Sequence, residues 1–336
     1  MNLTPSKKKV AVTGASGHIG ANLVRELLGR GYRVVALVRQ SSLALEGLDV
    51  ERVNGDILDL QSLRSAFSGV EQVYHLAAWI SIQPGDRDKL ELINVEGTRN
   101  VIEACRDEGV STLVHFSSIH ALEQEPLELA VTEDNPLVEE RSGYIGDYNL
   151  SKSRADTLVR QNDCGTLTTR IIYPTAVLGP NDFKMSLFGQ VVTRLAHGKL
   201  PALVAGGFDW VDARDVAWGA VEAAEKGADG DRFMLSGHYL SMPVVAAVIS
   251  ELSGVPAPKL TCPTWLAGLF APLMGGWARL TGETPLYTRD SLAALKANKV
   301  MSYARASRLF NYQPRPFRES MVDTLNFYSN QKQYDR

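Results

Sequence analysis

The chain has 336 residues, of which 45% are hydrophobic and 22% are charged, and its formal net charge at pH 7 is −3. A chain of this length and composition can bury a large core in one or two domains. It lacks the basic field with which proteins attract nucleic acid or anionic lipid, so nucleic acid is excluded as the expected partner.

The cysteines and the N-terminal residues indicate a cytoplasmic protein. Cys105, Cys164 and Cys262 are too scattered for a disulfide framework, and none has metal-ligand spacing with another cysteine or a histidine. We therefore expect no metal and a reducing compartment. Only three consecutive apolar residues, 10–12, precede a glycine-rich turn, so no signal peptide is expected.

Short apolar runs alternate with helical stretches in the first half, a pattern typical of βαβ units around a parallel sheet. The predicted strands are residues 10–12, 33–38, 72–76, 112–116 and 168–172. Each is nearly continuously apolar, as expected for strands that are covered on both faces. The sequence therefore predicts an α/β fold with a doubly wound parallel sheet.

A glycine-rich turn connects the first predicted strand to the first helix. Glycines at such a turn let the backbone approach a pyrophosphate, and the free N–H groups of the helix N-terminus bind its charge. Inside a βαβ unit this motif predicts dinucleotide binding rather than a purely structural turn. The residues expected to contact the cofactor here are Gly14, Ser16, Gly17, His18, Ile19 and Gly20.

The residue that follows the second strand indicates which dinucleotide is bound. Where NAD-binding domains carry an acidic residue for the ribose hydroxyls, this chain has Val38 and then Arg39. A guanidinium can form a forked contact with a 2′-phosphate, so NADP(H) is expected rather than NAD(H), with Ser41 and Ser42 as further donors. The alternative is a solvated Arg39. Asp56 is expected to accept from the adenine amino group, to cap the next helix, or both.

Two tyrosines precede a lysine by four residues, the spacing that places both side chains on one helical face. Tyr148 and Lys152 lie between the fourth and fifth strands, so their helix is expected beside the carboxyl edge of the sheet, where α/β folds bind ligands. Tyr328 and Lys332 lie in a polar C-terminal stretch, where we expect a solvated tyrosine. The first pair is therefore the candidate catalytic pair.

Two serines end the fourth strand. Only one of them can point into the cleft, because side chains alternate along a strand, and we choose Ser118 over Ser117. The alternative is that both serines only cap the strand end. His120 is expected to face the same cleft, either as a substrate contact or as an ordinary loop histidine.

In this order the motifs resemble those of the extended short-chain dehydrogenase/reductase family. The resemblance rests on the glycine-rich turn, Gly55-Asp56, His75-Leu76-Ala77-Ala78, Asn94-Val95-Glu96-Gly97-Thr98, Ser118, Tyr148, Lys152, and the stretches 170–180 and 210–216. Val38-Arg39 and residues 206–212 look most like the dihydroflavonol reductase and 3β-hydroxysteroid dehydrogenase branch. The resemblance implies a Rossmann-type sheet with a smaller α/β substrate domain.

The family also implies roles for these residues. Tyr148 would be the general acid or base, Lys152 would hold the nicotinamide ribose and lower the tyrosine pKa, and Ser118 would orient a carbonyl. The chain would then be an NADP(H)-dependent carbonyl reductase or alcohol dehydrogenase. Further cofactor contacts would come from Ile57, Ala77, Ala78, Asn94, Tyr173 and Pro174, although packing would explain the last three equally well.

Related epimerases and dehydratases share the same serine, tyrosine and lysine, so other residues must select the reaction. Sugar dehydratases carry a carboxylate run at the catalytic strand end, whereas this chain has Ser118-Ile119-His120. Nucleotide-sugar enzymes usually place an arginine just before the stretch that matches Trp210, and residues 206–209 lack it. A reductase is therefore favoured over a nucleotide-sugar epimerase or dehydratase, and over a non-catalytic NADP-binding sensor or scaffold.

The second half is expected to bind the substrate. Residues 1–175 are predicted to form the NADP-binding domain, to which the chain returns at about 212–235, and residues 176–336 an interleaved substrate-binding region. Residues 260–278 are uncharged and apolar, but prolines and glycines interrupt them, so a membrane-spanning helix is not expected. We expect a pocket wall or lid for a largely apolar ketone or alcohol, with Phe270 and Trp277 as contacts. A buried helix, a homodimer contact and an interfacial membrane contact are the alternatives.

Overall fold

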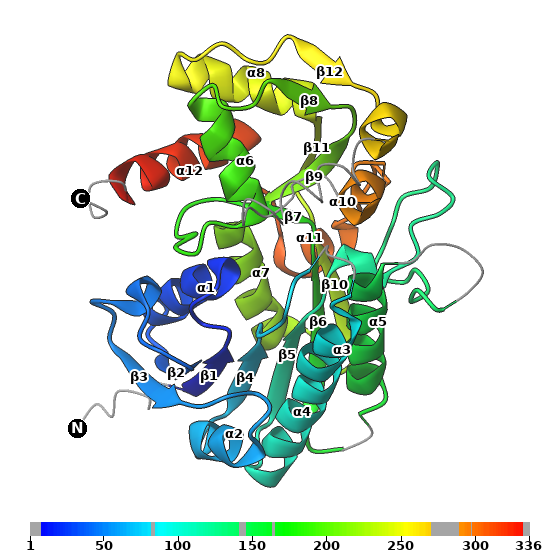
Figure 1. Cartoon of the computed structure of the whole chain (residues 1–336). Helices are drawn as coiled ribbons and strands as arrows, with labels where there is room; N and C mark the ends of the chain where they lie inside the picture. The colour runs from blue at the N-terminus through cyan, green and yellow to red at the C-terminus, as the bar shows by residue number, and fades with distance from the viewer. Residues whose placement is uncertain are drawn as a thin grey trace.

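A seven-stranded parallel sheet forms the centre of the molecule (Figure 1). The computed structural model describes residues 8–81, 85–140, 146–162, 165–269, 289–296 and 298–331. In spatial order the strands are β10 (Asp231–Leu235), β6 (Thr168–Pro174), β5 (Thr112–Phe116), β4 (Gln72–His75), β1 (Lys9–Thr13), β2 (Arg33–Val38) and β3 (Val50–Asn54). This order confirms the doubly wound sheet, and all five predicted strands belong to it.

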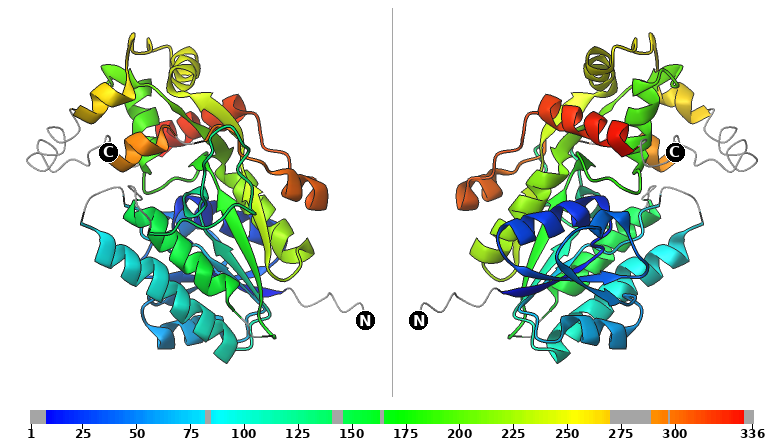
Figure 2. Two further views of the ribbon diagram at one scale, coloured as in Figure 1. Left: turned by 90° about the vertical axis from the view of Figure 1, so that its right-hand side faces the viewer. Right: turned by 90° about the vertical axis from the view of Figure 1, so that its left-hand side faces the viewer.

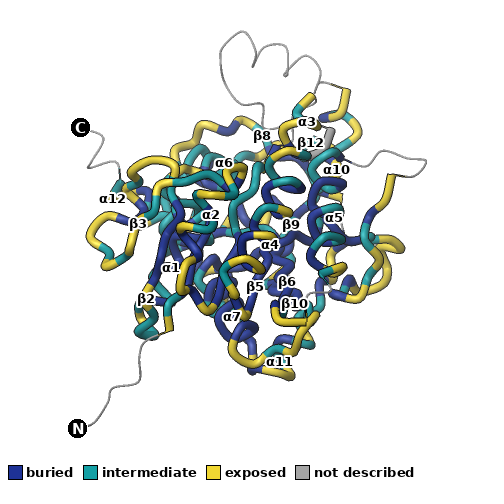
Figure 3. The backbone as a smooth tube through the Cα atoms, turned by 90° about the horizontal axis from the view of Figure 1, so that it is seen from below, coloured by how far each residue is buried: buried dark blue, intermediate teal, exposed yellow. Residues whose placement is uncertain are grey.

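Helices cover both faces of the sheet, which explains why its central strands are apolar throughout. Val10 and Val12 of β1 pack into one layer, while Ala11 packs into the opposite layer. The first layer contains α1 (His18–Gly29) and α7 (Ala213–Lys226), and the second contains α2 (Leu60–Phe67), α4 (Gly97–Asp107) and α5 (Asp147–Arg160). The buried strands are visible from below in Figure 3.

The edge strand β3 differs from the strands at the centre. Most of its side chains are partly or fully exposed, because only β2 pairs with it. Between β4 and α4 the chain forms a short helix, α3 (Arg87–Leu90), and then a π-helical stretch (Glu91–Glu96) that continues directly into α4. Such π-helical turns are rare and occur frequently at functional sites.

A smaller region lies at one end of the sheet (Figure 2). It contains a three-stranded sheet, a two-stranded sheet and several helices around a separate apolar core. Its strands are β7 (Ala176–Leu178), β8 (Ala202–Val204), β9 (Gly207–Asp212), β11 (His238–Ser241) and β12 (Leu260–Cys262). Its helices are α6 (Leu187–Ala196), α8 (Met242–Ser253), α10 (Arg289–Ala294) and α12 (Phe317–Gln331).

The chain passes between the two regions more than once. After β9 it enters α7 and β10, which belong to the large sheet and its helical layer. A second return was not predicted from the sequence. Ala306 and Phe310 of α11 (Ala304–Phe310), followed by Tyr312, are buried in the core around α1 and α7.

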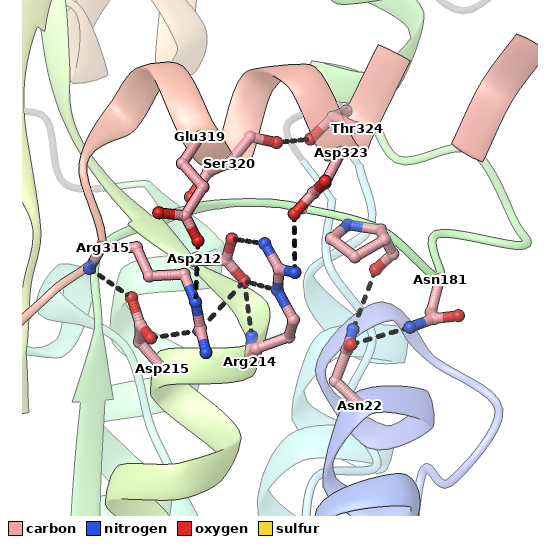
Figure 4. A network of polar contacts seen from close by, with 12 residues as sticks. Asn22, Asn181, Asp212, Arg214, Asp215, Arg315, Glu319, Ser320, Asp323 and Thr324 are labelled. Carbon is pink, nitrogen blue, oxygen red and sulfur yellow. Dashed lines mark hydrogen bonds and ion pairs between the residues drawn. The ribbon is translucent and has the colours of Figure 1, made fainter. Parts of the chain in front are cut away.

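Ion pairs connect the start of α7 to α12 (Figure 4). Arg214 donates to Asp212 at 2.9 and 2.7 Å and contacts Asp323 of α12 at 2.7 Å. Arg315, just before α12, is paired with Asp215. These contacts link the C-terminal helix to the point at which the chain returns to the large sheet. In the part of the chain that the structure describes, no helix has the length and apolar character needed to cross a membrane.

Candidate active site

The glycine-rich turn brings the backbone close to the end of β4. Gly14 has a φ of +71°, and a Cβ added there would lie 2.7 Å from the backbone nitrogen of Ala77. The N-cap residue of α1 is Gly17, which offers no side-chain acceptor, and the first turn of this helix contains no acidic residue. The helix N-terminus therefore keeps its positive end available, which fits a dinucleotide pyrophosphate.

The adenosine end of this site contains an exposed guanidinium. Arg39 follows β2, and no ion pair joins it to a carboxylate among the described residues. Asp56 Oδ1 accepts from the backbone N–H of Leu58 at 3.0 Å. The predicted capping role of Asp56 is wrong, because α2 begins at Leu60 with Asp59 as its N-cap. Ser42 caps a short 3-10 helix through its hydroxyl oxygen.

Ser118, Tyr148 and Lys152 come together at the carboxyl edge of β5. The Ser118 side chain is close enough to Tyr148 to lower its pKa, and its hydroxyl oxygen accepts from the backbone N–H of His120 at 3.2 Å. Ser117 is buried, and no described residue bonds to its hydroxyl, as strand alternation predicts if Ser118 is the residue that faces the cleft. The Lys152 ammonium is buried and donates to the carbonyl of Phe116 at 2.7 Å.

The electrostatics of this trio differ from the sequence-based expectation. Burial raises the pKa of Tyr148 to about 12, and the hydrogen bond with Ser118 only partly opposes the rise. Burial lowers the pKa of Lys152 to about 8, against the attraction of the Asp156 carboxylate. Loss of solvation therefore dominates the pKa of Tyr148 in this arrangement.

A buried polar network that was not predicted lies beneath the trio. Asp156, one helical turn after Lys152, is completely buried. Its carboxylate accepts from the hydroxyl of Tyr173 at 2.7 Å and lies 3.3 Å from the Nε2 atom of His115. Arg160 donates to the same tyrosine hydroxyl at 2.8 Å. The four-residue spacing between Lys152 and Asp156 is the signal that could have revealed it.

This network determines the role of the Tyr173 side chain. The ring is fully buried and its hydroxyl is bound within the network, so packing explains this side chain. Pro174 ends β6 beside Leu235 and is also buried. A cofactor contact from either residue would therefore have to come from its backbone.

Asn94 holds the π-helical stretch against the catalytic helix. Its amide nitrogen donates to Ser151 Oγ at 2.9 Å and to the carbonyl of Trp79 at 3.0 Å. Its amide oxygen accepts from the Trp79 backbone N–H at 2.7 Å. Because Ser151 precedes Lys152, these bonds fix the first turns of α5 relative to the loop after β4.

The remaining predicted cofactor contacts lie on the loops that follow β3 and β4. Ile57 is buried against Gly97, where an added Cβ would lie 2.5 Å from its Cδ1 atom. Ala77 donates its backbone N–H to Thr13 Oγ1 at 3.2 Å, and Ala78 follows it in a partly buried position. These small and apolar side chains leave room beside the glycine-rich turn.

His120 lies next to Tyr148. Its ring is 6.1 Å from that of Tyr148 between centroids, with an edge-on orientation of 69°. Burial lowers the pKa of His120 to about 4. At neutral pH it is therefore an uncharged hydrogen-bonding group rather than a cation.

The described part of the apolar segment is not a buried helix. Trp265 and Leu269 are each 66% exposed, and Leu260 is 70% exposed. The buried-helix alternative is therefore wrong for these side chains. Phe270 and Trp277 lie outside the described residues, so their predicted substrate contacts stay predictions. The described residues contain no cluster of three or more side chains suited to a metal ion.

The prediction of a solvated Tyr328 is wrong. This residue is buried on α12, and its hydroxyl donates to Asp182 Oδ2 at 2.6 Å. Asp182 lies 146 positions earlier in the chain, so local sequence around Tyr328 could not reveal the contact. Lys332 lies outside the described residues. Tyr328 therefore acts as a structural group between α12 and the loop after β7.

Comparison with known proteins identifies the family. A model of the NAD dependent epimerase/dehydratase family matches residues 10–236. The chain belongs to this family. Sterol demethylase protein B of Methylococcus capsulatus is 36% identical over 94% of this chain and 97% of its own length. A putative dihydroflavonol 4-reductase of Synechocystis is 31% identical over 95% of this chain and 94% of its own length.

Two further matches extend the comparison. A bovine sterol-4-alpha-carboxylate 3-dehydrogenase (decarboxylating) is 28% identical over 95% of this chain and 92% of its own length. The crystal structure of gox2253 superposes with a TM-score of 0.84 at 31% identity, over 97% of this chain and 99% of that one. The resemblance to the extended family and its dihydroflavonol reductase-like branch is thereby confirmed. This member of the epimerase/dehydratase family has reductases and dehydrogenases among its relatives, and the family binds a nicotinamide dinucleotide.

Proposed function

We propose that the protein is an NADP(H)-dependent dehydrogenase or reductase that interconverts a secondary alcohol and a ketone on a large, mostly apolar substrate. The observation that carries the proposal is the trio at the end of β5. Ser118 lies close enough to Tyr148 to lower its pKa, the buried Lys152 donates to the carbonyl of Phe116 at the end of the same strand, and the His120 ring lies edge-on to that of Tyr148. No carboxylate occupies the positions directly after Ser118, where a dehydratase would need an acid.

The trio suits proton transfer to a carbonyl oxygen. With its pKa raised to about 12, Tyr148 keeps its proton at neutral pH, and this is the form that can donate to a ketone as it is reduced. Ser118 would hold the same oxygen by a second hydrogen bond. In the oxidative direction the deprotonated form of Tyr148 would accept the proton of the alcohol. The dinucleotide, when bound, supplies or accepts the hydride.

The residues at the start of β9 support an apolar substrate over a nucleotide sugar. No arginine is present among residues 206–209. Phe208 and Trp210 pack edge-on against Phe188, with centroids 4.9 and 4.8 Å apart. The names of two relatives refer to sterols. We therefore propose a hydroxyl or keto group on a polycyclic apolar skeleton as the substrate class, with a nucleotide sugar as the rival.

The experiment tests a panel of substrates, and turnover is measured through the absorbance of NADPH. Purified protein with NADP⁺ or NADPH is assayed against 3-hydroxysterols with and without a neighbouring carboxylate, the matching ketones, simple aliphatic ketones, and UDP- and dTDP-sugars. We expect turnover with the polycyclic alcohols or ketones and none with the sugars. Epimerisation of a sugar would overturn the proposal in favour of an epimerase. Tight NADPH binding without turnover of any compound would favour a sensor.

A further inference from the structure

A loop from the smaller region reaches across to the glycine-rich turn. It comprises residues 179–186, between β7 and α6. His18 Nε2, on the first turn of α1, lies 3.1 Å from the carbonyl of Gly179 and 3.2 Å from that of Pro180. Asn22 donates to Pro180 at 2.9 Å and accepts from Asn181 at 2.9 Å (Figure 4). Helix α1 therefore binds this loop at several points.

The other side of the loop is held by the C-terminal helix. Asp182 is buried and accepts from the backbone N–H of Ser186 at 2.7 Å and from the Tyr328 hydroxyl at 2.6 Å. Phe183 packs edge-on against Phe327 of α12, with centroids 5.1 Å apart. Contacts on both sides restrict the conformation of the loop, so its residues have defined positions.

Lys184 is the residue that this loop presents to the cofactor site. Its ammonium donates to Ser16 Oγ, inside the glycine-rich turn, at 3.0 Å. Ser16 lies in the turn that follows β1, and Arg39 directly follows the neighbouring β2, whose Leu37 pairs with Thr13. Two cations and a hydroxyl are therefore found at the carboxyl edge of β1 and β2, where the ribose of the adenosine half of a dinucleotide is expected to bind.

The positive charges of Arg39 and Lys184 are not balanced by an ion pair within the described residues. No ion pair joins Arg39 or Lys184 to a carboxylate in the described ranges of the chain. Burial lowers the pKa of Lys184, and the nearby positive charge of Arg39 lowers it further. Two cations that repel each other, one of them bound to the Ser16 hydroxyl, form a site that an anion would stabilise.

We propose that Lys184, supplied by the smaller region, binds the 2′-phosphate of NADP(H) together with Arg39 and Ser16. The proposal rests on the proposed preference for NADP(H) and adds a specificity-determining residue to it. Lys184 was not predicted from the sequence, because it lies 168 positions from Ser16. In this arrangement the 2′-phosphate contacts both regions of the molecule, so its presence stabilises their relative position.

The test compares two nucleotides that differ in the 2′-phosphate. The unmodified protein, Arg39→Ala and Lys184→Gln are titrated calorimetrically with 2′,5′-ADP and with 5′-AMP. We expect each substitution to weaken 2′,5′-ADP binding by about 10- to 100-fold, as the loss of a charge-assisted hydrogen bond does, with less than a twofold change for 5′-AMP. Lys199→Gln, at an exposed lysine after α6, is the matched control and should change neither affinity.

The possible outcomes distinguish a failure of the role proposed for Lys184 from a failure of the proposed NADP(H) preference. Equal losses for both nucleotides in Lys184→Gln would place Lys184 at the 5′-phosphate and overturn the inference. Unchanged 2′,5′-ADP binding in Lys184→Gln, with a loss in Arg39→Ala, would also overturn it while leaving the NADP(H) preference intact. If the unmodified protein does not prefer 2′,5′-ADP over 5′-AMP, both fail. Lys184→Arg, which keeps the charge, should retain most of the preference.

Discussion

The glycine-rich turn and the apolar segment of the smaller region are built in different ways. At the glycine-rich turn, backbone atoms approach so closely that a single added carbon would collide with Ala77. At the apolar segment, Trp265 and Leu269 are largely exposed. If the first binds the dinucleotide and the second the substrate, as we propose, the first is constrained by chemistry common to every dinucleotide, whereas the second is free to differ from one substrate to another.

The largest expected effect comes from the proposed proton donor. Tyr148→Phe should lower kcat by about 10²- to 10⁴-fold, the contribution typical of a positioned acid or base. Cofactor binding, measured by NADPH fluorescence titration, should change little because the ring remains. Tyr32→Phe is the matched control, since its hydroxyl donates to Glu225 on the molecular surface. A loss below threefold for Tyr148→Phe would remove the tyrosine from the mechanism.

A pair of glycines in one helix tests the rigidity of the cofactor region. Gly20→Ala would push a methyl group into the carbonyl of Gly14, so we expect a loss of about 1–3 kcal/mol in the free energy of unfolding and weaker NADPH binding. Gly29, at the other end of α1, has open space around it. Gly29→Ala should instead stabilise the protein by about 0.5–1 kcal/mol. Denaturant unfolding measures both, and equal effects would contradict the assignment of a tight turn.

The buried network beneath the trio should influence the pH dependence. Lys152, with its pKa near 8, loses its charge as the pH rises through that value, so kcat/KM should fall on the alkaline side. The Asp156 carboxylate raises this pKa, so Asp156→Asn should move the alkaline limb to lower pH. Asp49→Asn, at an exposed site, serves as the control. An unchanged limb in Asp156→Asn would limit Asp156 to a structural role.

The smallest effect on stability is expected in the substrate region. Trp265→Ser and Leu269→Ser should each change the free energy of unfolding by no more than about 0.5 kcal/mol, because both side chains are mostly exposed. If this surface contacts an apolar substrate, both variants should raise KM for a polycyclic ketone and leave NADPH affinity unchanged. Unchanged KM in both would assign these side chains to another surface role.

Local patterns in the sequence predicted the fold and much of the candidate site. The strands follow from apolar runs, and the pairing of Tyr148 with Lys152 follows from helical spacing, because both depend on neighbours in the chain. Lys184 and Tyr328 could not be found in this way. Their partners, Ser16 and Asp182, lie 168 and 146 positions away. Such contacts exist only once the two regions have packed together.

The pKa of Tyr148 is raised, whereas the sequence led us to expect a lowered value. This difference also arises from contacts that form only in the folded protein. The sequence places a lysine one turn from the tyrosine, and that proximity alone suggests a lowered pKa. It does not reveal that the ammonium donates to the Phe116 carbonyl, nor how far the phenol is removed from water. Burial and the choice of hydrogen-bond partner are properties of the assembled cleft.

The late return of the chain through α11 has a consequence for synthesis and for truncated variants. Phe310 packs against Phe233 and Trp218, with centroids 5.2 and 5.9 Å apart, and the Tyr312 hydroxyl donates to the carbonyl of Ser236 at 3.0 Å. A ribosome must therefore release nearly the whole polypeptide before the nucleotide-binding half can close its own core. A fragment that stops near residue 236 would expose aromatic surface that the complete chain covers, and we expect it to aggregate rather than fold as an independent module.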